Sequence, residues 1–333
     1  MSHKLTKVRA TVTILTYNGE DYLRQILEAL RIQEYEPGFE VLIIDSGSTD
    51  STLSIIADFP DVRLHEIPNT EFGHGKTRNL AATLAKGEFV AFLTHDAVPL
   101  GPHWLAELVA PFDISPRVAG VFGLQVPRPN AMPTIRLGIL GTFASIGAPE
   151  STTLYELREH DGPDIGWKAF YSDVNSATRR SILLRDIPYH EVDYAEDQLF
   201  GRDLLRAGLI KAYAARAAVA HSNDLTLRTY GPRIYDETFG LREAGLIDGL
   251  PTRLHSVRTV IKMSVHEIWM IARDRGIGRK RRVLWCVLTP AVQWTRERYW
   301  RLALSADLGD SREDRYSLEQ RLRRTTEDDP NQA

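Results

Sequence analysis

The sequence predicts an α/β fold, and three observations support this prediction. Short apolar segments of strand length alternate with amphipathic helical segments through the first half of the chain. The apolar segments end in polar or acidic residues, as strands do where they leave a sheet. The length of 333 residues, 43% of them hydrophobic and 26% charged, is enough for a large core in an ordinary globular protein. We therefore expect a largely parallel sheet between helical layers, a three-layer α/β/α sandwich.

The first half of the chain contains four expected strand–helix pairs. The helix expected at 20–33 places Leu23, Ile26, Leu27 and Leu30 on one face. A turn rich in Ser, Thr and Asp precedes the second helix and provides residues that cap helix N-termini. The expected strands are 10–15, 40–44, 62–67 and 89–93, and the expected helices are 20–33, 51–57, 73–86 and 102–112.

The second half is less regular. We expect a strand at 118–126, long connections with weak helical pieces over 128–164, and a segment 172–176 before a capped turn at 177–184. A helix at 196–207 ends at Gly208, a strand follows at 214–220, and the chain is largely helical from Thr226. The predicted organisation is an α/β domain over 8–240, a helical extension over 241–305 and a polar tail over 306–333.

Composition excludes several classes of protein. The formal net charge of −3 gives no reason to expect nucleic acid as a partner. Cys286 is the single cysteine, so no disulfide can form within the chain, which fits a reducing compartment. The first residues lack the apolar segment of a signal peptide, and no run of about 18 apolar residues occurs. We expect a cytoplasmic protein.

Residues 273–301 are strongly basic, with 9 Lys or Arg against 2 Asp or Glu. The same segment contains aromatic residues, among them Trp285, Trp294, Tyr299 and Trp300. A basic helix with aromatic side chains can lie in the headgroup layer of an anionic membrane. A helix that packs its apolar side on the domain or on a second copy of the chain explains the same pattern. Both interpretations remain open at this point.

Three strand ends bring polar residues to one edge of the expected sheet. Asp96 follows the strand 89–93, while the segments 16–18 and 45–50 follow the first two strands. The carboxyl ends of parallel strands meet at the edge where α/β proteins bind ligands. Asp45 there could accept the imide N–H of uracil or thymine, and Tyr17 could stack on the base. Alternatively, Asp45 is an ordinary turn residue and Asp50 caps a helix.

The segment 72–79 resembles the end of a phosphate-binding loop in Gly75, Lys76 and Thr77, but Thr70 stands where that motif requires its first glycine. A P-loop NTPase is therefore not expected. The glycine-rich helix start could still bind a diphosphate through backbone N–H groups, with Lys76 and Arg78 adding positive charge. Solvation of the surface is the other role open to these two side chains.

Two further positions could carry chemistry. Glu196 and Asp197 begin a predicted helix, where the dipole favours ionised carboxylates, and Asp197 could act as a general base for a sugar hydroxyl. Both acids could instead only stabilise the helix N-terminus. His221 follows the strand 214–220 and could complete a cation site with Asp96, or it could be a hydrogen-bonded structural residue.

Together these motifs resemble glycosyltransferase family 2, the inverting enzymes with a GT-A fold. The resemblance covers residues 8–240, and the separated motifs agree with the family in order and spacing. The segments 72–79 and 94–99 are most similar to those of bacterial rhamnosyltransferases. Thr94 stands where the family often has the first Asp of its Asp-x-Asp motif. The matching motifs are Thr16-Tyr17-Asn18, Asp45 to Asp50, Arg78-Asn79, Asp96, Glu196-Asp197 and His221.

The resemblance implies roles for these residues. Asp197 would deprotonate the acceptor hydroxyl, and Asp96 with His221 would bind Mg²⁺ or Mn²⁺ at the donor diphosphate. Acceptor contacts are expected from the segments 167–175 and 226–235, and from Glu196 at the helix start. The residues assigned to the nucleotide-sugar donor are Thr16, Tyr17, Asn18, Asp45, Ser46, Gly75, Lys76, Arg78, Asn79, His95 and Asp96. Those assigned to the acceptor are Trp167, Asn175, Glu196 and Arg228.

The implied function is transfer of a sugar to a saccharide acceptor in the synthesis of a bacterial surface polysaccharide. The expected donor is dTDP-rhamnose, with UDP-sugars next. The acceptor could be lipid-linked, with the protein peripheral at the inner membrane face, and a homodimer is also compatible with the basic helices. Two other classes remain: a nucleotidyltransferase, which would need a basic glycine-rich loop where Tyr17 to Glu20 stand, and a catalytically silent nucleotide-sugar binding protein.

Overall fold

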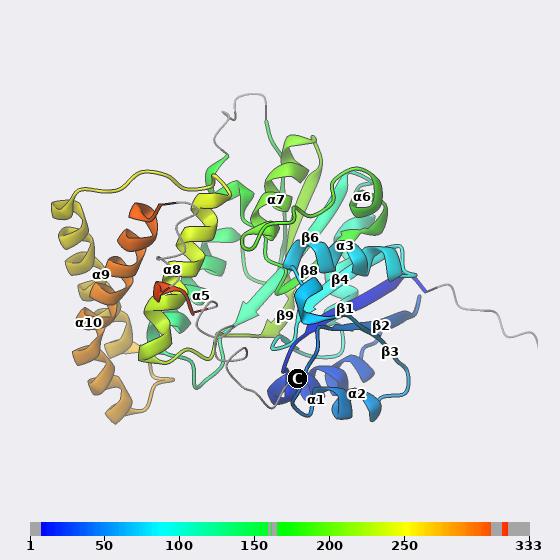
Figure 1. Cartoon of the computed structure of the whole chain (residues 1–333), viewed down its shortest axis with the longest axis horizontal. Helices are drawn as coiled ribbons and strands as arrows, with labels where there is room; N and C mark the ends of the chain where they lie inside the picture. The colour runs from blue at the N-terminus through cyan, green and yellow to red at the C-terminus, as the bar shows by residue number, and fades with distance from the viewer. Residues whose placement is uncertain (1–7, 159–160, 162–164, 308–314, 319–333) are drawn as a thin grey trace, which may run out of the picture. The chain divides into compact units, whose positions relative to one another are not determined.

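The computed structural model describes residues 8–158, 161, 165–307 and 315–318 (Figure 1). The chain forms two compact units. The first comprises Met1–Arg128 with Ile139–Ser222, and the second comprises Pro129–Gly138 with Asn223–Ala333. The division after Ser222 falls before the predicted boundary at 240 because helix α8 (Leu227–Glu243) packs along α10 (Arg279–Ser305).

Among the described residues, the first unit contains one mixed sheet of nine strands in the order β3-β2-β1-β4-β8-β6-β9-β5, with β7 beside β9. The first four strands in this order are parallel, as the alternating pattern predicts. β8 then pairs antiparallel with both β4 and β6. The strands are β1 (Ala10–Thr16), β2 (Phe39–Asp45), β3 (Val62–Glu66), β4 (Phe89–Thr94), β5 (Val98–Pro99), β6 (Val118–Val126), β7 (Thr152–Tyr155), β8 (Asn175–Arg179) and β9 (Ile210–Ala220).

Helices cover both faces of this sheet and give the expected three layers. One apolar core lies between the sheet and α1, α2 and α4, with Leu23, Ile55 and Trp104 among its residues. The other lies against α3, α6 and α7 and includes Ala81 and Phe200. The helices of this unit are α1 (Glu20–Arg31), α2 (Thr52–Ala57), α3 (His74–Leu84), α4 (Trp104–Val109), α6 (Arg180–Arg185) and α7 (Glu196–Arg206).

Several elements differ from the sequence-based expectation, among them the short strands β5 and β7, which were not expected. The helix expected at 102–112 ends at Val109 and continues as a 3₁₀ turn, Ala110–Asp113, because Pro111 cannot donate a helical hydrogen bond. The connection 128–164 contains a 14-residue helix, α5 (Pro133–Ile146). β8 spans the end of the segment 172–176 and the first three residues of the capped turn expected at 177–184. β9 begins four residues early because the buried Lys211 interrupts the apolar pattern of its first half.

The second unit is helical, apart from its connections, over the residues that the structure describes. It contains α8, α9 (Arg253–Arg273), α10 and the start of α5, and α10 packs against both α8 and α9. Tyr230, Ile271 and Trp285 form part of its core. Most of the polar tail predicted at 306–333 lies outside the described residues. Within the described part, no helix combines the length and the hydrophobicity needed to cross a membrane.

Candidate active site

Asp45 ends β2 and organises the loop that follows it. Its Oδ1 accepts hydrogen bonds from the backbone N–H groups of Gly47 (3.0 Å) and Ser48 (2.8 Å). Its Oδ2 accepts from the hydroxyls of Thr16 (2.7 Å) and Ser48 (2.6 Å). The side chain is fully buried, and these four donors match the acceptor capacity of a carboxylate. A nucleotide base can therefore reach Asp45 only by displacing one of them.

The two loops after β1 and β2 are tied to each other. Asn18 has a φ of +48°, a left-handed conformation that asparagine tolerates. Its Oδ1 accepts a hydrogen bond from the Thr49 N–H (2.8 Å), and its own N–H donates to Ser48 Oγ (2.9 Å). The Ser46 N–H and hydroxyl both donate to the Thr16 carbonyl. Tyr17, between these anchors, is partly exposed. The structure thus holds the predicted base-binding loops in one fixed arrangement.

Asp96 and His221 form a pair at the same edge of the sheet. Asp96 Oδ2 lies 3.3 Å from His221 Nε2. The Thr94 hydroxyl donates to Asp96 Oδ1 at 2.6 Å, so the threonine that replaces the family's first Asp orients the second. Burial opposes ionisation of Asp96, but the hydrogen bond to His221 and its charge, together with Thr94, outweigh burial and hold the pKa of Asp96 below its ordinary range. Asp96 is therefore a carboxylate at neutral pH.

Three residues that the sequence did not single out position this pair. Gln125 Oε1 lies 2.9 Å from His221 Nδ1, and Gln125 Nε2 donates to Ser172 Oγ at 2.9 Å. Arg128 donates hydrogen bonds to the carbonyl oxygens of Asp96 and Ser222. These bonds connect the segment after β4 to the segment after β9. No periodicity or spacing in the sequence marks these contacts, because they connect residues 32 to 96 positions apart.

The Asp96–His221 pair fits a divalent cation. Gln125 Oε1 faces Nδ1 and can accept a hydrogen bond from it, so Nε2 is the nitrogen that would bind a cation, which would replace the proton between His221 and Asp96. A carboxylate oxygen suits both Mg²⁺ and Mn²⁺, whereas an imidazole nitrogen favours a transition metal such as Mn²⁺ over Mg²⁺; adjacent ligands of an octahedral ion lie about 3 Å apart. No group of three or more His, Cys, Asp or Glu ligands occurs among the described residues. The remaining ligands would have to come from a bound diphosphate and water.

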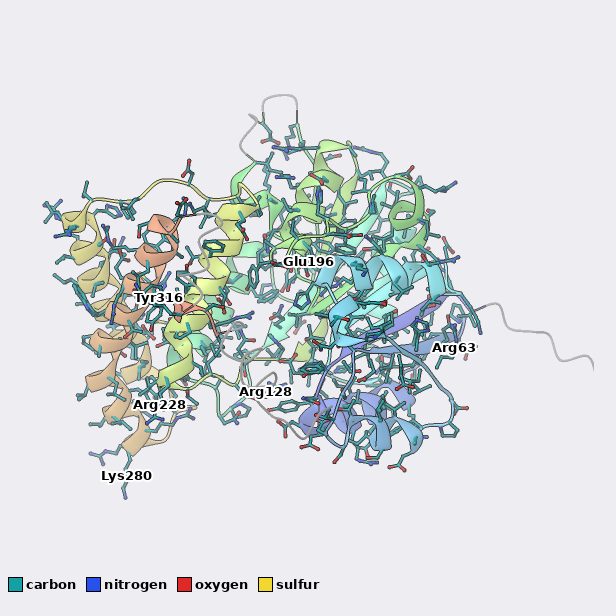
Figure 2. The ribbon with its side chains drawn as sticks, in the orientation of Figure 1. Arg63, Arg128, Glu196, Arg228, Lys280 and Tyr316 are labelled. Atoms are coloured by element: carbon teal, nitrogen blue, oxygen red, sulfur yellow. The ribbon has the colours of Figure 1, made fainter. Side chains whose placement is uncertain are left out.

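A buried acidic cluster surrounds Arg78 in α3. Its Nε lies 3.1 Å from Asp173 Oδ2, and its Nη1 lies 2.5 Å from Glu196 Oε1. Asp173 Oδ1 also accepts hydrogen bonds from the hydroxyls of Tyr189 (2.9 Å) and Ser176 (2.6 Å). Glu196 lies inside the first unit (Figure 2) and is 6% exposed. Burial lowers the pKa of Arg78, but the two carboxylates outweigh it, so the guanidinium stays charged.

Asp197 stands at the edge of this cluster, in the first turn of α7. Its Oδ1 accepts from the Gln198 N–H (2.7 Å) and its Oδ2 from the Asp173 N–H (3.4 Å). Burial and then the charges of Glu196 and Asp173 raise the pKa of Asp197 well above its ordinary value. A carboxylate with a raised pKa is a stronger base, and part of Asp197 remains accessible to solvent. The preceding Ala195 has a φ of +64°, a left-handed conformation that is strained for a residue other than glycine.

The consecutive residues Ser172 and Asp173 connect the Asp96–His221 pair to the acidic cluster around Arg78. The Ser172 hydroxyl holds Gln125, which positions His221, while the backbone and carboxylate of Asp173 contact Asp197 and Arg78. Asp96, His221 and Asp197 are therefore parts of one network. Asp45 lies on the same edge two strands away, since β1 separates β2 from β4. Two strand spacings correspond to about 10 Å.

The start of α3 packs against another segment of the same chain, at Tyr189 and His190. This differs from the prediction that it binds a diphosphate. A Cβ on Gly75 would lie 1.9 Å from the His190 carbonyl oxygen, so this position needs glycine for the close approach of that segment. Asn79 exchanges two hydrogen bonds with the backbone of Tyr189, each 2.9 Å long. Arg78 is buried against carboxylates, and Lys76 alone of the predicted diphosphate contacts in this segment is exposed. His95, after β4, packs against Gly19.

The predicted acceptor residues lie in different environments. Asn175 does not face an acceptor, because it is completely buried: it accepts from Trp104 Nε1 and donates to the carbonyls of Leu124 and Ala217. Glu196 pairs with Arg78. Trp167 is 63% exposed and packs edge-on against Tyr155. Arg228 is exposed in α8 of the second unit. Trp167 and Arg228 stay predictions.

Comparison with known proteins identifies the family. The sequence pattern of glycosyl transferase family 2 matches residues 11–183. The chain is 32% identical to the O-antigen chain rhamnosyltransferase RfbN of Salmonella typhimurium over 233 residues. This aligned region covers 69% of this chain and 71% of RfbN. This chain belongs to glycosyltransferase family 2. A second member, the O-antigen chain rhamnosyltransferase WbaN of Salmonella anatum, is 34% identical over 231 residues, 68% of this chain and 70% of WbaN.

Solved structures agree with the fold expected for a family 2 glycosyltransferase. The mannosyltransferase PcManGT from Pyrobaculum calidifontis, solved with GDP-mannose and Mn²⁺, superposes with a TM-score of 0.57 at 19% identity and covers 91% of this chain and 88% of its own. TarS residues 1–349 from S. aureus superpose with a TM-score of 0.51 at 20% identity and cover 89% and 90%. The fold of this glycosyltransferase is GT-A, as predicted.

Proposed function

We propose that this glycosyltransferase transfers L-rhamnose from dTDP-rhamnose to a saccharide acceptor with inversion at the anomeric carbon. The observation that carries the proposal is the 32% and 34% identity with two O-antigen chain rhamnosyltransferases over about 70% of the chain. The names of these relatives also support a place in surface polysaccharide synthesis, and we propose in addition that the saccharide acceptor is lipid-linked. We keep transfer from a UDP-sugar as the second candidate, since TarS residues 1–349, which are similar in fold, have also been solved with UDP-GlcNAc.

The donor would bind along the carboxyl edge of β1, β2 and β4. Tyr17 and the loop after Asp45 would contact the base, with Thr16, Asn18 and Ser46 holding that loop in place. Lys76 would reach the diphosphate from the start of α3, and His95 would border the same edge. Asp96 and His221 would hold the divalent cation, Mg²⁺ or Mn²⁺, which supplies positive charge to the leaving diphosphate when bound.

Asp197 would act as the general base. Its raised pKa makes it a better proton acceptor for the sugar hydroxyl, and two backbone N–H groups hold its carboxylate in a fixed orientation. Glu196 and Asp173 pair with Arg78, and these contacts keep both acids beside Asp197. As Asp197 takes the hydroxyl proton, the acceptor oxygen becomes nucleophilic enough to displace the nucleoside diphosphate from the opposite face of the sugar.

The donor is tested by offering dTDP-rhamnose, UDP-glucose and GDP-mannose separately in the presence of Mn²⁺ and measuring release of the nucleoside diphosphate. We expect the fastest release from dTDP-rhamnose. Asp197→Asn should reduce release by about 10² to 10⁴ while nucleotide binding is retained, since the amide cannot accept the proton. Faster release from UDP-glucose would replace the donor assignment, and near-normal turnover of Asp197→Asn would remove Asp197 as the base.

A further inference from the structure

The helices α9 and α10 form a hairpin whose outward side chains are unusually apolar. The two helices are joined by five residues and pack side by side (Figure 1). In α9, exposed apolar residues recur at steps of three and four, so they form one stripe along the helix. The stripe of α9 consists of Leu254, Val257, Ile261, Val265 and Trp269, and that of α10 consists of Val283, Leu284, Val287 and Trp294.

These stripes are not the packing faces of the hairpin. The buried residues of α9, such as Ser264 and Ile271, and those of α10, such as Trp285 and Val292, lie on other sides of the helices. Val265 is 65% exposed and Val287 is 72% exposed. Scattered exposed apolar residues are ordinary, but nine large ones on two adjacent helices indicate an interaction surface.

The charge of the hairpin identifies the kind of partner. Residues 253–305, all of which the structure describes, contain 12 Lys or Arg against 3 Asp or Glu, although the whole chain has a net charge of −3. None of the three acids is exposed: Glu267 and Glu297 are buried, and Asp274 pairs with Arg136 at 3.1 Å. The exposed bases are Arg253, Arg258, Lys262, Arg273, Arg275, Arg279, Lys280, Arg296 and Arg298.

Basic and apolar side chains are interleaved on this surface. Arg258 and Lys262 lie between apolar positions of the α9 stripe, and the Arg273 guanidinium stacks over the Trp269 ring at 4.0 Å. Lys280 projects from the end of the hairpin (Figure 2). An anionic bilayer surface offers phosphates for the bases and acyl chains for the apolar residues, with tryptophan at the boundary. A second copy would instead bring two basic surfaces together, which like-charge repulsion opposes.

We propose that the α9–α10 hairpin binds the surface of an anionic lipid bilayer, with the apolar stripes in the headgroup–acyl boundary. The hairpin alone carries this proposal. Membrane binding would also bring the enzyme to the surface where a lipid-linked acceptor lies. This consequence rests on the proposed function. Vesicle binding is measured without donor or acceptor, so its outcome is independent of the donor assignment.

The test is co-sedimentation of the full chain with phosphatidylcholine vesicles, with and without phosphatidylglycerol. We expect the anionic lipid to increase the bound fraction more than about tenfold at low salt, and high salt to reverse the increase. Arg258→Glu with Lys262→Glu should remove most of the binding. The control pair Arg185→Glu with Arg206→Glu makes the same charge change at exposed positions of the first unit, and this variant should still bind the anionic vesicles.

The apolar contribution is tested with Ile261→Gln and Val265→Gln, which keep helix-forming residues, against Ile114→Gln and Leu184→Gln as exposed controls elsewhere. Only the first pair should weaken binding, and unchanged melting temperatures would show that both pairs fold. Equal binding to neutral and anionic vesicles, or no binding to either, would overturn the proposal. A dimer in analytical ultracentrifugation that the Ile261 and Val265 changes dissociate would overturn it in favour of a second copy.

Discussion

The carboxylates at the binding edge of the sheet differ because of the groups around each of them. Asp45 accepts four hydrogen bonds from its own loops and is completely buried. Asp96 is held ionised by His221 and Thr94. Asp197 lies beside two other acids, and its pKa is raised. The same side chain therefore organises a loop at Asp45, and in the proposed function it would bind a cation at Asp96 and accept a proton at Asp197, according to its neighbours.

Asp173 is predicted to tune Asp197. Since the Asp173 charge raises the pKa of Asp197, Asp173→Asn should lower that pKa. The loss of one acid also frees Arg78 to stabilise the ionised form of Asp197, which shifts the pKa in the same direction. A base works when deprotonated, so the rise of kcat/KM with pH should move to lower pH. Transfer rates measured against pH test this prediction.

A matched control is Asp193→Asn, which neutralises an exposed acid three residues before Glu196. This variant should leave the pH profile in place. A profile of Asp173→Asn that moves to higher pH, or does not move, would contradict an electrostatic role for Asp173.

At the scale of the elements, glycine and asparagine in α3 serve packing. Gly75 and Asn79 let the segment at Tyr189 and His190 approach the helix, and this approach keeps Arg78 next to the acids of α7. Gly75→Ala should destabilise the protein by about 1–3 kcal/mol, since the added methyl group meets a backbone carbonyl. Denaturant unfolding provides the measurement.

Gly141→Ala in α5 is the comparison for this change. A Cβ there meets nothing within 4 Å, so the substitution should stabilise the helix by up to about 1 kcal/mol. If both substitutions changed the free energy of unfolding equally, close packing at Gly75 would not be the reason for its glycine.

Lys211 in β9 gives the fold a pH dependence. Its amine is buried near the rings of Phe122 and Tyr155 and donates to the Phe170 carbonyl. Burial lowers its pKa to about 7 from an ordinary value of 10.5. Between these values the unfolded chain binds more protons than the folded chain, so this residue adds stability as pH rises from 7 and costs most below 7.

Lys211→Met should therefore raise the melting temperature more at pH 6 than at pH 9, because it removes the cost of burying a charge. Thermal unfolding at the two pH values measures the difference. Lys86→Met, which changes an exposed lysine, should give a similar small effect at both. A larger gain for Lys211→Met at pH 9 would show that its burial is not what limits stability.

At the scale of the whole molecule, the proposed donor site depends on tertiary structure. Asp96 and His221 follow β4 and β9, which lie more than a hundred residues apart in the chain, so only the folded protein can present both to a cation. A ligand that binds only the folded state stabilises it by about 2.7 kcal/mol at a hundred times its Kd. With dTDP and Mn²⁺ together, the melting temperature should rise by about 5 °C.

Chelation of the metal or the change Asp96→Ala should remove most of this rise, whereas Asp186→Ala, at an exposed position, should retain it. A thermal shift that is unchanged in Asp96→Ala would exclude this carboxylate from the nucleotide site.

Much of the fold was predictable because its signals are local. The alternation of apolar strands and amphipathic helices located β1 to β4 and the helices between them, and the polar residues after these strands predicted the edge at which a ligand would bind. β8 and the first half of β9 were missed, because their partners lie across the sheet and Lys211 breaks the apolar pattern. Side-chain pairing is even less local: Arg78 and Glu196 are 118 positions apart.

The sequence by itself determined the GT-A architecture, the family and the edge of the sheet where Asp96, Asp197 and His221 would gather. The periodicity of apolar residues and the polar residues at strand ends are patterns among residues close together in the sequence, so a single sequence is enough to recognise them. Only the tertiary structure decided that the Asp45 carboxylate is occupied by its own loops, that Asp173 and Gln125 support the site, and that Asn175 belongs to the core. Burial and hydrogen bonding are properties of distance in space, which the order of residues does not specify.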